Sequence, residues 1–162
     1  MGQNLQFLLN KKDNLCIILQ KGFKLLFTKS TAYTLHALVE LSKFDKPVDV
    51  THLAEITELP KPFLAKLLQT LSRKGFVKSF KGIHGGFILS KEPKEIKIID
   101  IFRVMEDKNS LVFYCSSDPD DCMRNRASIC SIRPFFAYLE EEFLKIVQNY
   151  TLEDVIRMKS GK

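Results

Sequence analysis

The pattern of hydrophobic and polar positions between residues 49 and 89 changes its period along the chain. Apolar residues recur at helical spacing over residues 50–58 and again over residues 62–73, with a proline-containing turn between the two stretches. The second stretch carries one apolar stripe, which consists of Phe63, Leu64, Leu67, Leu68 and Leu71. Aromatic and β-branched residues then favour short strands at 76–80 and 87–89. The pattern therefore predicts two helices followed by a hairpin.

Local signals set the limits of these elements. Asp49 is suited to cap the first helix, because its carboxylate accepts hydrogen bonds from backbone N–H groups that have no partner inside the helix. Pro62 is favoured at the start of the second helix, and Gly75 is favoured at its end, where a left-handed residue closes many helices. The segment from Lys81 to Gly86 contains three glycines, as a tight hairpin tip requires.

This order of elements indicates a winged helix-turn-helix, in which one helix enters a DNA groove and the hairpin lies beside it. Charge supports that interpretation, because residues 28–91 hold 10 basic and 5 acidic side chains, whereas residues 92–162 hold 11 and 13. The alternative is an ordinary hairpin on a small α+β domain. The candidate DNA-contacting residues are Lys61, Pro62, Phe63, Lys66, Gln69, Arg73, Lys81 and His84.

Helical periodicity also extends over residues 31–44, 96–107 and 134–149, and Thr151 is suited to cap a short terminal helix. One face of the 134–149 stretch and the residue after it carries Phe135, Phe136, Leu139, Phe143, Ile146, Val147 and Tyr150. Such a face is a candidate dimer surface, and the alternative is that it packs on its own domain. The predicted fold is mainly α with a small β-wing (α+β), a winged helix-turn-helix domain followed by a long C-terminal dimerisation helix.

The periodicity fails between residues 108 and 133, and a loop of this length usually has a function or is disordered. We therefore divide the whole chain into four predicted parts. They are an N-terminal extension at 1–27, the winged helix-turn-helix domain at 28–107, a cysteine loop at 108–133, and the dimerisation helix with the C-terminal segment at 134–162.

Cys115, Cys122 and Cys130 are three thiols within the cysteine loop. Their spacing is wider than the C-x2-C pairs of zinc fingers and suits an iron–sulfur cluster. Three thiolates leave one position for a fourth ligand of another type, whereas the alternative is three unliganded surface cysteines. The chain shows neither a secretory signal nor a run of about 18 apolar residues, so we expect no membrane contact and a reducing compartment for the thiols.

The sequence contains no phosphate-binding loop, nucleophile elbow or paired acid–base motif, so we predict no enzymatic activity. Three function classes are left open. The first is a DNA-binding regulator controlled by a cluster, and the second is a winged-helix regulator without a cluster that responds to a small ligand or a partner enzyme. The third is an iron–sulfur protein of electron transfer or cluster delivery, which would not bind a promoter specifically.

The three-cysteine loop and three further stretches together resemble the Rrf-type winged-helix transcriptional regulators, the family that includes the iron–sulfur regulator IscR and the nitric-oxide sensor NsrR. The three stretches read LFTKSTAYTLHALVEL from residue 26, LPKPFLAKLLQTLSRKGFVKSFKGIHGGFIL from residue 59, and YTLEDVI from residue 150. The resemblance implies a cytoplasmic homodimer whose winged helices bind a palindromic operator in double-stranded DNA. Our leading hypothesis is that this regulator is a repressor. It also implies that the three cysteines of the loop hold a 2Fe–2S or 4Fe–4S cluster, whose gain, loss or damage alters DNA affinity.

The resemblance assigns roles to several residues of the second predicted helix. Pro62, Phe63 and Ala65 occupy positions where relatives reach bases, and Phe63 is suited to touch a thymine methyl group. Lys61 and Lys66 would serve phosphates, and Lys81 matches the basic residue of the wing.

The chain departs from its relatives at the fourth cluster ligand. IscR-like members place a histidine where Arg133 stands, and NsrR-like members use a carboxylate where Ala32 stands. His36 matches the position of a histidine in other relatives, so His36 of the partner subunit is the first candidate. The alternatives are a small thiol, Asp118, Asp120 and Asp121. Because the domain of relatives starts near Leu26, our hypothesis is that residues 1–27 reflect a start codon assigned too far upstream.

Overall fold

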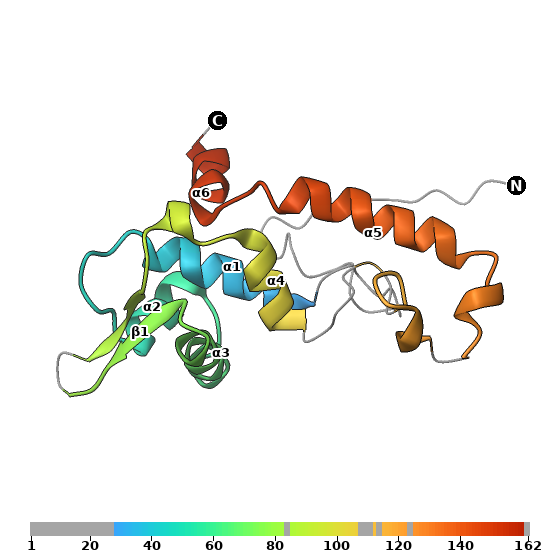
Figure 1. Ribbon diagram of the computed structural model, residues 1–162. Coiled ribbons are helices and arrows are strands. Elements are labelled where there is room, and N and C mark those ends of the chain that lie inside the picture. The colour runs from blue at the N-terminus through green and yellow to red at the C-terminus, as the bar shows by residue number, and fades with distance from the viewer. Residues whose placement is uncertain (1–27, 83–84, 107–111, 113–114, 123–124, 161–162) are drawn as a thin grey trace, which may run out of the picture.

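The computed structural model describes residues 28–82, 85–106, 112, 115–122 and 125–160 (Figure 1). The elements are α1 (Lys29–Leu41), α2 (Val50–Thr57), α3 (Lys61–Arg73), β1 (Val77–Phe80), β2 (Gly86–Leu89), η2 (Pro93–Glu95), α4 (Ile98–Glu106), η3 (Pro119–Asp121), η4 (Ala127–Ile129), α5 (Arg133–Val147) and α6 (Leu152–Ser160). The described residues are thus mainly helical with one two-stranded antiparallel sheet, which confirms the predicted fold class. Within them, no helix has the length and apolar character that crossing a membrane requires. The predicted N-terminal extension lies outside the described residues.

Short-range hydrogen bonds explain where the helices begin and end. Asp49 accepts a hydrogen bond from the backbone N–H of Thr51 at 2.7 Å and caps α2, as predicted. Gly75 lies just after α3 with a φ of 78°, its N–H donates to Ser72, and the N–H of Phe76 donates to Leu71 at 2.9 Å. These two bonds form a Schellman motif, which confirms the predicted left-handed end.

The start of α3 corrects the prediction by one residue. The helix begins at Lys61 rather than at Pro62, because Pro60 takes the N-cap position with a non-helical ψ of 125°. Pro62 is therefore the second helical residue, where its missing N–H still costs no intrahelical hydrogen bond.

The hydrophobic core is built by residues from α1, α2, α3, β1, α4, α5 and α6. Four leucines of the predicted stripe on α3 are buried in it, whereas Phe63 is 37% exposed and lies at the edge of the helix instead. The fully buried Leu152 brings α6 into the same core. The predicted cap of α6 is also present, because the N–H and hydroxyl of Thr151 donate to Asp154 Oδ2 at 2.8 and 2.7 Å.

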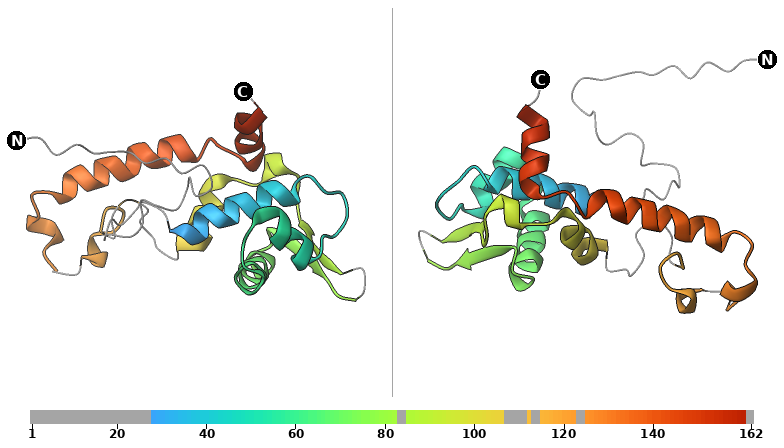
Figure 2. Two further views of the ribbon diagram at one scale, coloured as in Figure 1. Left: turned by 180° about the vertical axis from the view of Figure 1, so that it is seen from behind. Right: turned by 45° about the horizontal axis from the view of Figure 1, so that its top comes forward.

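Helix α5 extends away from the body formed by α1, α2, α3 and the hairpin in all three views (Figures 1 and 2). Its apolar face, predicted as one stripe, divides into two parts. Phe143 stacks on Phe102 with ring centroids 6.4 Å apart, and Val147 is buried in the core. Phe135 and Ile146 are instead about three-fifths exposed. Only part of the predicted face is thus available for another subunit.

Candidate nucleic-acid interface and cysteine loop

The exposed side of α3 gathers most of the predicted DNA-contacting residues. Pro62, Lys66, Gln69 and Arg73 recur at i, i+4, i+7 and i+11, so they lie on one face, opposite the buried leucines. All four side chains are exposed. The face carries two cations and no carboxylate, which suits a polyanionic partner.

Lys61 lies apart from this face and links α3 to α2. Its Nζ donates to Thr51 Oγ1 at 2.7 Å, and Thr51 in turn donates from its backbone to Asp49. The hydrogen bonds from Thr51 lower the pKa of the Asp49 carboxyl, and the charge of Lys61 adds to this effect. This chain of contacts fixes the start of α3 against the start of α2.

Phe63 lies at the other edge of the exposed face, toward α1. Its ring meets the ring of Tyr33 edge-on, with centroids 5.7 Å apart and an interplanar angle of 84°. Sequence reasoning did not connect Tyr33 with Phe63, because the two residues belong to different helices. The contact holds an exposed aromatic side chain at the start of α3.

The hairpin is fixed in position by a third segment. Val48 and Phe87 exchange two backbone hydrogen bonds of 2.9 Å, which pair β2 with the residue just before the cap of α2. Gly86 allows this approach, because a Cβ atom there would stand 2.5 Å from the carbonyl carbon of Val48. The orientation of the wing relative to the two helices therefore depends on a backbone contact that only glycine permits.

The wing carries exposed side chains beyond those predicted. Lys81 is exposed at the tip, whereas His84 lies outside the described residues. Lys78 and Phe80 are also exposed, Phe80 by 49%, and both lie on one face of β1. The alternation of residues 77–80 could have identified this pair from the sequence.

The three cysteines of the loop lie in different surroundings, and no disulfide joins them. Cys115 is 6% exposed, whereas Cys122 and Cys130 are partly exposed. Cys122 directly follows the short helix η3 and Cys130 directly follows η4, and these two turns contact each other. In the described part of the chain, no three His, Cys, Asp or Glu side chains gather closely enough to hold a metal ion.

Two buried carboxylates lie around the start of the loop. Glu140 on α5 is 3% exposed and accepts hydrogen bonds from the N–H of Val112 at 2.8 Å and from the hydroxyl of Ser116 at 2.6 Å. Glu106 ends α4 and accepts from the N–H of Thr28 at 2.8 Å and from the hydroxyl of Thr31. Sequence reasoning missed both carboxylates.

A signal for these two residues was present in the helical spacing. Glu140 lies four residues after Phe136, and Glu106 lies four residues after Phe102, so each charge interrupts an apolar stripe. A carboxylate at such a position is buried only when hydrogen-bond donors surround it. The donors come from segments that are distant in sequence.

Two of the candidate fourth ligands have contacts of their own in the described residues. The imidazole of His36 is half-exposed, and its Nε2 lies 3.9 Å from Glu40 Oε1. Asp118 caps η3 by accepting from the N–H of Asp120 at 2.9 Å. Three residues after Cys130, the Nε of Arg133 is a buried donor without a hydrogen-bond partner in the described residues.

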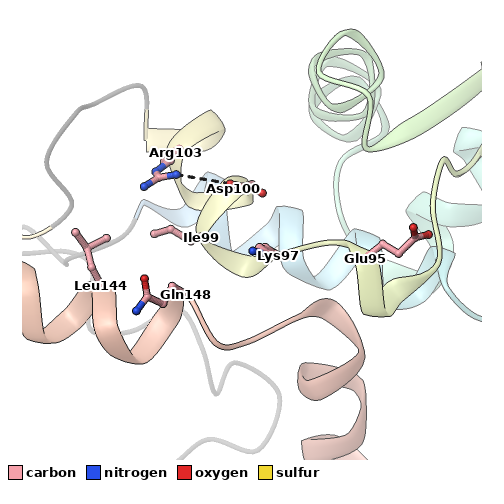
Figure 3. Close-up of a pocket in the computed structure, with 7 residues that line it drawn as sticks. All are labelled: Glu95, Lys97, Ile99, Asp100, Arg103, Leu144 and Gln148. Carbon is pink, nitrogen blue, oxygen red and sulfur yellow. Dashed lines mark ion pairs between the residues drawn. The ribbon is translucent and has the colours of Figure 1, made fainter.

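A separate hollow lies between α4 and α5, with a volume of about 360 Å³ (Figure 3). Lys97, Asp100 and Arg103 line it from the side of α4, and Gln148 lines it from the end of α5. Asp100 and Arg103 form an ion pair across 3.8 Å. Charges of both signs in this hollow between α4 and α5 could bind a small zwitterionic molecule.

Comparisons with known proteins agree with this arrangement. The model of the family described as Rrf2, iron-dependent transcriptional regulator, matches residues 27–158. A protein of Aquifex aeolicus that is provisionally named an HTH-type transcriptional regulator is 32% identical over 136 residues, which are 83% of this chain and 94% of that protein. The HTH-type transcriptional regulator NsrR of Bacillus licheniformis is 28% identical over 80% of this chain and 90% of its own.

Among solved structures, CymR, the global cysteine regulator of B. subtilis, superposes with a TM-score of 0.64. It is 26% identical, and the match covers 82% of this chain and 96% of that chain. These relatives are regulators of transcription and not enzymes, as predicted from the absence of catalytic motifs.

Proposed function

The chain belongs to the Rrf2 family of iron-dependent transcriptional regulators, and from this premise we propose that it is a homodimeric repressor whose DNA affinity is set by an iron–sulfur cluster. The family match and the similarity to NsrR both support DNA-binding regulation of transcription. The cluster, the repression, the palindromic operator and the cytoplasmic location are the further parts of the proposal.

The exposed face of α3 beside the fixed wing is the observation that carries the proposal. In a winged helix-turn-helix, the second helix enters the major groove, and basic side chains around it pair with phosphates. Lys66 and Arg73 on α3 would neutralise phosphates on either side of the groove. Lys78 and Lys81 on the hairpin would do the same for the neighbouring backbone.

The exposed half of α5 supports a second subunit. Phe135, Tyr138 and Ile146 expose more than half of their surface on a helix that extends away from the core (Figure 2). Burial of such aromatic area against a second copy would place two α3 helices in one particle, which matches a palindromic operator.

The donor chemistry of the loop fits an iron–sulfur cluster. Cys115, Cys122 and Cys130 would supply three thiolates, and Arg133 would offer its unpaired Nε–H to a sulfur-rich anion. Because the described residues do not yet gather these thiols, the loop would have to close around the group. A bound cluster would supply a centre that reacts with oxygen and nitric oxide and that responds to iron supply.

The two buried carboxylates give the loop a route to the DNA-binding helices. Glu140 ties the start of the loop to α5, and Glu106 ties the end of α4 to Thr28 and Thr31 at the start of α1. Closing the loop would shift the end of α4 against α1, and Tyr33 on α1 contacts α3 directly. The spacing of the two α3 helices on DNA would change as a result.

The test combines anaerobic purification with DNA footprinting. We expect coloured protein with iron and sulfide in comparable amounts, and protection of a palindrome upstream of its own gene that changes when the cluster is removed. Replacing the three loop cysteines with serine should abolish the colour and the response. Ser128→Ala is the matched control, because Ser128 is exposed in the same loop and carries no thiol. Promoter occupancy that is the same for the triple variant and the native protein, with and without oxygen or nitric oxide, refutes the sensing role.

A cluster-free regulator is the second candidate function. The likeness to the global cysteine regulator CymR and the charged hollow between α4 and α5 both favour it. That version predicts colourless, iron-free protein whose operator affinity changes with a small zwitterion such as an amino acid. Asp100→Asn should then remove the response to the zwitterion and leave the affinity of the unliganded protein unchanged.

A further inference from the structure

The start of the recognition helix is apolar, which is unusual for a surface that meets DNA. Pro62 and Phe63 are exposed and Ala65 is partly exposed, and none of these side chains forms hydrogen bonds. Lys61 is already engaged with Thr51. In a helix-turn-helix, the residues at the start of this helix are the ones that contact base edges. Direct reading at this end of α3 must therefore use apolar contact.

Phe63 is held in one place for such a contact. The edge-on packing against Tyr33 restricts the phenyl ring, while 37% of the residue stays open to solvent. A ring that is held in advance loses little conformational freedom on binding. Because Tyr33 packs against the Phe63 ring, its role would be to position that ring.

The chemistry of the major groove selects the partner of an apolar ring. Adenine and guanine present donors and acceptors at the positions that vary, cytosine presents a donor and only a C5–H, and thymine presents an acceptor and a C5-methyl group. A phenyl ring placed against a donor or acceptor would leave that group without water or a hydrogen bond. Thymine, with its methyl group, therefore offers the largest apolar surface for burial against Phe63.

We propose that Phe63 selects thymine in each operator half-site through the C5-methyl group, with Tyr33 positioning its ring. The proposal rests on the DNA-binding function proposed above. It is independent of whether a cluster controls that function.

The test replaces single thymines with deoxyuridine, which lacks only the methyl group. The operator is first selected from random duplexes with the full-length protein, and each thymine is then replaced in turn. Loss of the buried methyl group in one half-site should weaken binding about fourfold. Loss of both methyl groups, one in each half-site, should weaken binding about fifteenfold. Replacement at the other thymines is the control and should have little effect.

Variants of the protein complete the cycle. Phe63→Ala should bind the thymine and deoxyuridine duplexes equally, and Tyr33→Ala should lose much of the discrimination, whereas Tyr33→Phe should keep it. Each result is a ratio of two duplexes against one protein, so a change in the folded fraction cancels. Native protein that is indifferent to every deoxyuridine, or an unchanged ratio in Phe63→Ala, overturns the proposal. Failure to select any common sequence would instead refute the DNA-binding function.

Discussion

Gly86 offers the sharpest test of how the wing is held. Its φ of 149° lies in a range that L-residues with side chains rarely adopt, and a Cβ atom there would overlap the backbone of Val48. Gly86→Ala should therefore strain the hairpin and separate β2 from the segment before α2. Gly75→Ala is the matched control, because Gly75 also has a positive φ, of 78°, but has no atom within 4 Å of the added Cβ.

The expected magnitudes differ because only one site is crowded. The control should lose about 1–2 kcal/mol of unfolding free energy, the usual cost of a left-handed residue with a side chain. Gly86→Ala should lose roughly 1–3 kcal/mol through backbone strain. Separation of Val48 from Phe87 adds the loss of two hydrogen bonds, at about 0.5–1.5 kcal/mol each. The total for Gly86→Ala is about 2–6 kcal/mol.

Urea unfolding followed by circular dichroism measures both variants, and a filter or fluorescence assay measures their DNA affinity. We expect Gly86→Ala to be less stable than Gly75→Ala and, under conditions where both are folded, to bind DNA more weakly. Equal losses of stability in the two variants would show that the Val48 contact does not hold the wing. A destabilised Gly86→Ala with native DNA affinity would show that the wing position does not matter for binding.

Three further predictions follow from other contacts. Lys66→Ala should weaken DNA binding for all sequences and reduce the slope of log affinity against log salt by about 1, whereas Lys145→Ala on α5 should leave the slope unchanged in the same titration. Glu140→Ala should lower the free energy of unfolding, measured in urea, by about 1–3 kcal/mol, because Val112 and Ser116 lose a buried acceptor. A variant whose loop resists proteolysis as well as the loop of the native protein does would contradict this. Hydrogen bonds from Thr51 hold the pKa of Asp49 below its ordinary value of 3.8, so the stability from this cap is present above that pH and is lost as the pH falls below it. The difference in thermal midpoint between native protein and Asp49→Ala should therefore shrink in acid, and a difference that is constant down to pH 2 would refute the cap.

Much of the fold follows from interactions between residues close in sequence. Asp49 caps the start of α2 and Gly75 closes α3. Both act through hydrogen bonds between residues two to five positions apart, so their roles were predictable. The four buried leucines of α3 were predictable for the same reason, because helical spacing alone places them on one face. The exposed position of Lys66 and Gln69 follows from that same spacing.

The placement of the site depends on residues that are far apart in sequence. Phe63 was assigned to the apolar stripe, yet Tyr33 on another helix holds it at the edge of the exposed face. The apolar face of α5 was read as one surface, and only its packing on Phe102 separated the core half from the exposed half.

The order of helices and strands, their caps and the residue types available for DNA and metal follow from the amino-acid order alone, because they depend on short-range spacing. The orientation of the wing and the burial of Glu106 and Glu140 depend on the folded arrangement. Gly86 meets Val48 and Glu106 meets Thr28 only after the chain has folded, since no local pattern records the partner of a contact between distant segments.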